Sequence, residues 1–187
     1  MRFVIFDRDG VLNQHVVNAD HGTFDSPLHP EQVVLEPGAA EALAALTARG
    51  FVIAIASNQP AAAKGKTTWA NLEAVNSRVI ELLEVAGARI SSSHLCPHRS
   101  EQSCECRKPK PGLLQQALER HPEAQAAQSW MVGDGVTDVE AGWALGMKTG
   151  LIGARRCDGC RALDSRQPDY WGSLDGLVSR LLAESAA

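Results

Sequence analysis

Near the start of the sequence, four apolar residues are followed by two carboxylates two positions apart, in Phe3-Val4-Ile5-Phe6-Asp7-Arg8-Asp9-Gly10. The apolar run, with its β-branched members, predicts a short buried strand of the kind found in parallel sheets. Asp7 then lies at the carboxyl end of that strand and Asp9 just beyond it. Carboxylates this close raise each other's pKa unless a cation lies between them, so the pair indicates a hard-metal site or an acid–base couple. The alternative is a strand that ends in a polar turn, where Asp and Gly are common.

The composition is that of an ordinary globular protein. With 187 residues, 44% hydrophobic and 21% charged, we expect a single domain spanning residues 1–187. The net charge of −4 does not indicate a basic surface that would bind nucleic acid or an anionic membrane. No apolar run is long enough to span a bilayer, and the first residues enter a strand without a secretion signal, so we expect a cytoplasmic protein. Five cysteines in such a chain indicate reduced thiols and metal binding before disulfides.

Apolar runs that fit strands alternate with helical patterns along the rest of the chain. This order predicts a three-layer, Rossmann-like α/β fold, in which a parallel sheet carries helices on both faces. Residues 14–37 are predicted to form one long irregular loop that shapes the site. A helix from Thr68 to a stop at Gly87 is expected to pack through one stripe, formed by Trp69, Leu72, Val75, Val79, Leu82 and Ala86. The other predicted strands span residues 51–56, 89–95, 130–132 and 148–152, and the other predicted helices span 39–49, a segment from Pro111, a segment ending at Ala144, and 174–182.

Polar residues follow several of these strands at their carboxyl ends. Ligands of such sheets bind beyond these ends, so we expect the polar residues to meet on one rim. Carboxylates combined with hydroxyl and amide donors and a lysine are typical of a magnesium site that holds a phosphate. For the Ser57-Asn58 and Gly133-Asp134 pairs taken singly, the alternative is turn and helix-cap chemistry. The residues concerned are Asp7 and Asp9 after the first strand, Ser57 and Asn58 after the second, Asp134 and Asp138 after the strand at 130–132, and Lys108.

A cysteine and histidine loop precedes Lys108. Cys96-Pro97-His98 and Cys104-Glu105-Cys106 offer three thiols and an imidazole, enough for a closed tetrahedral zinc site without an open coordination position. The alternative is a chance cluster of reduced cysteines. A structural zinc would stiffen the loop at about 95–107 and would hold Arg107 and Lys108 against the site.

A pair of cysteines and four histidines match none of these patterns. The Cys157-Asp158-Gly159-Cys160 segment fits half of a zinc site, a redox pair or two unrelated thiols. The other histidines show no partner in the sequence and are expected at surface or loop positions; they are His15, His29, His94 and His121.

Taken together, the motifs resemble those of the haloacid dehalogenase superfamily of phosphotransferases over nearly the whole chain. The four motifs are matched by Asp7–Asn13, by Ser57-Asn58-Gln59, by Lys108, and by Gly133-Asp134 with Asp138. The resemblance implies that Asp7 is the nucleophile that forms an aspartyl-phosphate, and that Asp9 protonates the leaving alcohol and later activates water. It implies a Mg²⁺ ion held by the Asp7 side chain, the Asp9 backbone carbonyl and the Asp134 carboxylate. Asp138 would lie close by, and Ser57 and Lys108 would bind the phosphoryl oxygens.

A zinc loop directly before Arg107-Lys108-Pro109 is similar to that of heptose-bisphosphate 7-phosphatases of bacterial lipopolysaccharide synthesis and of histidinol-phosphate phosphatases. The resemblance implies a role in substrate recognition for Arg107 and for the segment Asp20-His21-Gly22-Thr23, together with Asn58 and Gln59 of the second motif. This chain departs from the heptose enzymes at Gly135, where they commonly carry a lysine, and in its short zinc loop. The missing cation would weaken recognition of a second phosphate.

The resemblance also implies a site without a large cap domain, because no insertion here is long enough to fold into one. We expect the site to be open and bordered by residues 14–37, 60–67 and the zinc loop, and the chain to act as a monomer on a sugar phosphate. Lys64 and Lys66 either meet a remote phosphate or are solvated surface. The alternatives left open are a phosphatase for histidinol phosphate or another small phosphomonoester, and a zinc-stabilised binding module without catalysis.

Overall fold

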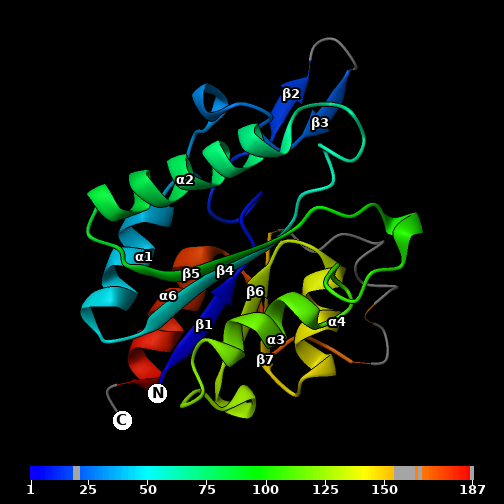
Figure 1. The fold of residues 1–187 in the computed structure, drawn as a ribbon. Coiled ribbons are helices and arrows are strands. Elements are labelled where there is room, and N and C mark those ends of the chain that lie inside the picture. The colour runs from blue at the N-terminus through cyan, green and yellow to red at the C-terminus, as the bar shows by residue number, and fades with distance from the viewer. Residues whose placement is uncertain (19–21, 154–162, 164–165, 186–187) are drawn as a thin grey trace.

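A parallel sheet forms the centre of the protein (Figure 1). The computed structural model describes residues 1–18, 22–153, 163 and 166–185. Within them the main sheet has six strands in the order β5-β4-β1-β6-β7-β8, and all neighbours run parallel. The predicted α/β class is therefore confirmed. The strands are β1 (Phe3–Phe6), β4 (Val52–Asn58), β5 (Ile90–Cys96), β6 (Trp130–Gly133), β7 (Lys148–Ile152) and β8 (Tyr170–Gly172).

Helices cover both faces of this sheet, as the alternating sequence pattern predicts (Figure 1). Side chains of β1 alternate between the two faces. Val4 and Phe6 pack with α1, α2 and α6, whereas Phe3 and Ile5 pack with α3 and α4, and none of the four is more than 1% exposed. The helices are α1 (Ala39–Ala48), α2 (Trp69–Val85), α3 (Gly112–Glu119), α4 (Val136–Ala144) and α6 (Leu174–Glu184).

The first strand in the chain lies at the middle of the sheet. The chain adds β4 and β5 on one side of β1 and then returns to add β6, β7 and β8 on the other. This reversal of strand order at β1 and β6 creates the crevice where ligands of open α/β sheets bind. Asp7 directly follows β1 and therefore stands at this crevice.

The prediction of an irregular loop over residues 14–37 was wrong in part. This segment contains an antiparallel hairpin, β2 (Val16–Asn18) with β3 (Thr23–Asp25), and a 3₁₀ turn at Pro30–Gln32. Val17 pairs with Phe24 across the hairpin, and these side chains are 66% and 75% exposed. Because neither strand buries a face, the sequence has no inward-facing alternation by which a strand is recognised.

The packing of α2 differs from the prediction at two positions. In α2 the fully buried residue of the last turns is Leu83, not Leu82, and Ala86 is exposed. Positions three and four residues beyond Val79 both fit the helical period, so the rotation of the helix on the sheet decides between them.

Strand β8 was not predicted, because its three partly buried residues carry no apolar run. Among the described residues, no helix has the length and apolar character needed to cross a bilayer.

The packing of α2 gives a test of the fold. Leu83→Ala should lower the free energy of unfolding by about 3 kcal/mol, because it leaves a cavity under a fully buried side chain. Leu82→Ala is the matched control and should cost clearly less, since Leu82 is only partly buried. Urea denaturation of both variants measures the difference, and equal costs would contradict the packing of α2 described here.

Candidate active site

The carboxyl ends of three adjacent strands bring the predicted site residues together. Asp7 follows β1, Ser57 lies near the end of β4, and Asp134 follows β6. Because β1 is paired with both β4 and β6, these residues lie on one rim of the sheet. Lys108 joins them from the loop between β5 and α3, and Asp138 from the first turn of α4.

Lys108 is the buried cation of this rim, with an exposed fraction of 2%. Its Nζ lies 3.1 Å from Asp7 Oδ1 and 2.5 Å from Asp138 Oδ1, and it donates to the Ala56 carbonyl at 2.7 Å. The ammonium group is thus paired with two carboxylates and hydrogen-bonded to one backbone carbonyl. Burial lowers the pKa of Lys108, but the Asp138 and Asp7 carboxylates outweigh it and raise the pKa above the usual value, so the lysine stays charged.

The carboxylates of the rim outnumber this cation. Oxygen atoms of Asp7, Asp134 and Asp138 all lie within 4.8 Å of one another. Burial raises the pKa of Asp7 to about 6; Lys108 opposes this rise, and Asp138 and Asp9 add to it. Burial and the Asp7 charge likewise raise the pKa of Asp134. A divalent cation would relieve this repulsion, and carboxylate oxygens are the ligands that hard cations prefer, so the donor set fits Mg²⁺.

Asp138 differs from the other two carboxylates because its oxygens are already engaged. It is 2% exposed, pairs with Lys108, and accepts a hydrogen bond from the Gly135 backbone N–H at 3.0 Å. Asp138 therefore orients Lys108 from the start of α4, which leaves Asp7 and Asp134 as the carboxylates best placed for a cation.

Asp9 lies in a separate, buried polar network. Asn13 donates to its Oδ1 at 2.9 Å, Gln59 donates to its Oδ2 at 2.6 Å, and Arg8 Nη2 lies 3.1 Å from Oδ1. Burial raises the pKa of Asp9, but the Arg8 charge and these hydrogen bonds outweigh it and hold the pKa below the usual value. Asp9 and Arg8 are 6% and 0% exposed, so this ion pair is shielded from water.

The structure engages Asn58 and Gln59 with other residues of the site. Asn58 Oδ1 accepts from the Lys108 backbone N–H at 3.1 Å, and Asn58 Nδ2 donates to the Lys108 carbonyl at 3.0 Å. Gln59 is 1% exposed and donates to Asp9 and to Ser57 Oγ. The side chains that the second motif places next to a substrate thus connect the β4 end to Lys108 and to Asp9.

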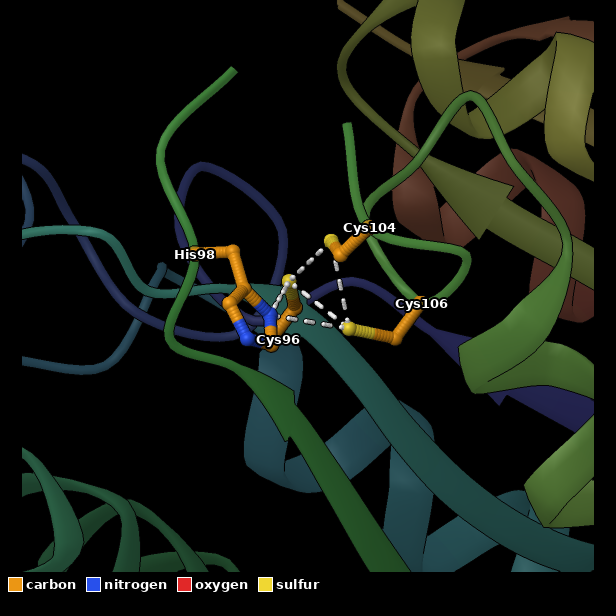
Figure 2. A group of neighbouring side chains, drawn as sticks. All are labelled: Cys96, His98, Cys104 and Cys106. Atoms are coloured by element: carbon orange, nitrogen blue, oxygen red, sulfur yellow. Dashed lines mark hydrogen bonds between the residues drawn. The ribbon is translucent and has the colours of Figure 1, made fainter. Parts of the chain in front are cut away.

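A second cluster of side chains that could ligate a metal lies beside this rim. Figure 2 shows Cys96, His98, Cys104 and Cys106 converging from the end of β5 and the following loop. Their ligand atoms lie within 4.8 Å of one another, with sulfur–sulfur distances of 3.1 to 3.7 Å. A tetrahedral site with metal–sulfur bonds of 2.3 Å separates its sulfurs by about 3.8 Å. The geometry therefore fits a four-coordinate divalent metal.

The charges of this cluster also favour a cation. Burial raises the pKa of Cys106 to about 12, and the nearby Cys96 and Cys104 thiols add to the rise. Without a cation, several thiolates cannot coexist at these distances. The cluster is joined to the rim through Arg107, whose backbone N–H donates to Cys104 Sγ at 3.4 Å and whose Nη1 donates to the His98 carbonyl at 3.1 Å.

The family comparison agrees with this geometry. The family model for haloacid dehalogenase-like hydrolases matches residues 15–146. The chain belongs to the haloacid dehalogenase-like hydrolases.

Individual members of this hydrolase family are similar over most of their length. A Neisseria meningitidis serogroup A protein named D-glycero-beta-D-manno-heptose-1,7-bisphosphate 7-phosphatase is 36% identical over 152 residues, which cover 81% of this chain and 77% of that protein. A Pseudomonas putida protein of the same name is 35% identical and covers 96% of this chain and 97% of its own length. The crystal structure of D,D-heptose 1,7-bisphosphate phosphatase from B. bronchiseptica, complexed with magnesium and phosphate, superposes with a TM-score of 0.81 at 28% identity and covers 98% and 99% of the two chains.

Some residues with a predicted role lie away from the rim in this hydrolase, or lie outside the residues that the structure describes. Gly22 and Thr23 lie on the exposed β2–β3 hairpin, and Lys66 pairs with Asp25 of the same hairpin at 2.7 Å. Asp20 and His21 lie outside the described residues, as do the cysteines of the open 157–160 segment, Cys157 and Cys160.

His15 is a rim residue that the sequence did not indicate. It is exposed, as expected, but its ring lies beside Gly10, where an added Cβ would stand 2.8 Å from His15 Cε1. Its charge acts on Asp134, whose pKa it lowers against the stronger effect of burial. Nothing in the sequence signals that His15 lies near Asp134, because the two residues are far apart along the chain.

Gly10 gives a test of how closely the first motif approaches Asp134. Its φ is +77°, and an added Cβ would lie 2.4 Å from Asp134 Oδ2. Gly10→Ala should therefore cost more than the roughly 1–2 kcal/mol that a left-handed backbone alone imposes on a side chain. Chemical denaturation of the purified variant measures this cost.

Gly65 provides the matched control. It has a similar φ of +71°, but nothing lies within 4 Å of an added Cβ. Gly65→Ala should show the backbone cost alone, and the excess at Gly10 should shrink when Asp134→Ala removes the opposing carboxylate. Equal costs at the two glycines would contradict the close approach.

Proposed function

We propose that this protein is a magnesium-dependent phosphatase that removes the 7-phosphate from D-glycero-D-manno-heptose 1,7-bisphosphate. The observation that carries the proposal is the Asp7 carboxylate at the end of β1, paired with the buried Lys108 and within ligand distance of Asp134. The names of the relatives support the substrate, and the magnesium and phosphate in the B. bronchiseptica structure support the ion and the bound group.

Asp7 acts as the nucleophile in this proposal. Its free oxygen attacks phosphorus, a new P–O bond forms, and the bond from phosphorus to the sugar oxygen breaks. Asp9 would donate a proton to the leaving sugar oxygen, for which it must first be protonated against the contacts with Arg8, Asn13 and Gln59 that lower its pKa. Asp9 then takes a proton from water, which attacks the aspartyl-phosphate and releases inorganic phosphate and the Asp7 carboxylate. Two displacements replace one difficult hydrolysis.

The remaining rim residues bind the phosphoryl group. The Ser57 hydroxyl and Lys108 would contact its oxygens, while Asp138 and Asn58 keep Lys108 in place. The Asp7 side chain, the Asp9 backbone carbonyl and the Asp134 carboxylate would hold Mg²⁺. When bound, this ion neutralises charge on the phosphoryl oxygens.

Substrate recognition beyond the phosphoryl group is assigned to the edges of the site. Arg107 stands directly before Lys108 and is fixed through His98 and Cys104, which supports a role in binding the sugar phosphate. Asp20, His21, Gly22 and Thr23 are proposed to take part in substrate recognition, as the resemblance implies. Residues 1–187 would act as one domain with an open site and without a large cap domain.

A structural Zn²⁺ is proposed at Cys96, His98, Cys104 and Cys106. All four positions of a tetrahedral ion would be filled by protein, which leaves no position for catalysis. The ion would hold the loop at 95–107, a segment with few apolar residues, and would thereby fix Arg107 and Lys108.

A substrate panel tests the activity and the nucleophile together. With magnesium, the parent should release phosphate from one anomer of heptose 1,7-bisphosphate faster than from histidinol phosphate or fructose 1,6-bisphosphate. Asp7→Asn should lower the rate at least about 10³-fold, because the amide cannot form the acyl-phosphate. Phosphate release is measured at matched enzyme concentrations, with circular dichroism and metal content as evidence that Asp7→Asn is folded.

The other outcomes of the panel each have a meaning. Equal turnover of all substrates would reject the heptose substrate and keep the phosphatase. No release by a folded, zinc-loaded parent would reject the catalytic proposal in favour of a binding module.

The zinc proposal has its own readout. Cys104→Ser should lose one equivalent of zinc by elemental analysis and should melt at a lower temperature, because the metal stabilises only the folded loop. Its phosphatase rate should also fall, since Arg107 and Lys108 follow the cluster. Cys157→Ser is the control, and retention of zinc by Cys104→Ser would exclude this cysteine as a ligand.

A further inference from the structure

Gln59 connects two residues to which the proposed mechanism gives different tasks. Its Nε2 donates to Asp9 Oδ2 at 2.6 Å and to Ser57 Oγ at 2.9 Å. Gln59 is 1% exposed, so its amide is enclosed by protein and not presented to the opening of the site. These contacts differ from the substrate contact that the second motif implies for this position.

We propose that Gln59 is a positioning residue that sets the orientation of the Asp9 carboxylate and the Ser57 hydroxyl relative to each other. This role rests on the proposed phosphatase function. Asp9 would transfer the proton and Ser57 would bind the phosphoryl group, whereas Gln59 would act on the reaction only through these two side chains.

The contact to Ser57 determines what the hydroxyl can do. A serine hydroxyl has one hydrogen to donate and lone pairs that accept. Because Ser57 Oγ accepts from the Gln59 amide, its own hydrogen remains available for a phosphoryl oxygen. Ser57 is 2% exposed and lies near the end of β4, so little freedom is left for other rotamers.

The contact to Asp9 fixes one carboxylate oxygen. Asn13, Arg8 and Ser26 also bind Asp9, but among the hydrogen bonds of the described side chains only those of Gln59 reach both Asp9 and Ser57. The Gln59 backbone N–H donates to the Cys96 carbonyl at 2.7 Å. The backbone of Gln59 is therefore anchored between the end of β4 and the first cysteine of the proposed zinc cluster.

The test uses the leaving group of the substrate. Proton donation by Asp9 matters for a sugar alkoxide, which is a poor leaving group, and matters little for p-nitrophenolate, which leaves without protonation. Gln59→Met removes the amide at nearly constant volume. The ratio of kcat for the heptose phosphate to kcat for p-nitrophenyl phosphate should fall about tenfold or more. A purely structural loss lowers both rates equally and leaves the ratio unchanged.

A double-mutant cycle shows whether the effect passes through Asp9. Asp9→Asn should lower the same ratio, and adding Gln59→Met to it should produce no further change in the ratio. Gln14→Met is the matched control, because Gln14 Nε2 donates to the Leu35 carbonyl at 3.3 Å and not to Asp9. Its ratio should equal that of the parent.

The outcomes separate this role from the proposed function. An active parent with an unchanged ratio in Gln59→Met, or additive effects in the cycle, would overturn the positioning role and leave the phosphatase in place. A folded parent that hydrolyses neither ester would overturn the phosphatase, and the positioning role with it. If Gln59→Met does not fold, Gln59→Asn, whose shorter side chain withdraws the amide from Asp9, gives the same comparison.

Discussion

The buried ammonium of Lys108 is the interaction on which the rest of the site depends. It stands between Asp7 and Asp138 and reaches the Ala56 carbonyl, and these partners come from the end of β1, from α4 and from β4. Without this charge, the end of β1 and the start of α4 would bring carboxylates together with no compensation, which is strongly unfavourable in a buried environment. The lysine therefore determines how closely these elements can approach.

The position of Lys108 is itself fixed by groups that do not touch its ammonium. Asn58 binds both backbone polar groups of Lys108, in the manner of a neighbouring strand, and Arg107 ties the preceding residue to the cysteine cluster. The loop between β5 and α3 has little apolar content, so these polar contacts, together with the proposed zinc, would replace a hydrophobic core as the source of its order. The candidate active site and the cysteine cluster therefore depend on the same loop.

Much of the fold and of the site could be predicted from sequence, and the failures have physical reasons. The run before Asp7 and the cysteine spacing are strong local signals, because burial and metal coordination each demand particular residue types at fixed distances. The β2–β3 hairpin buries no face and left no such pattern. Leu82 and Leu83 fit the helical period equally well. The contact of Gln59 with Asp9 spans fifty positions in the chain, and only the folded sheet reveals it.

The central place of β1 in the sheet has a consequence for biosynthesis. This strand is made first, but its two neighbours are β4 and β6, and β6 ends only at Gly133. A nascent chain therefore carries Asp7 and Asp9 long before it can enclose them, and pairing of distant segments makes the sheet slow to complete. We expect no shortened form that ends before β6 to retain part of the activity, since the pairing of β1 with β6 also brings Asp134 to Asp7.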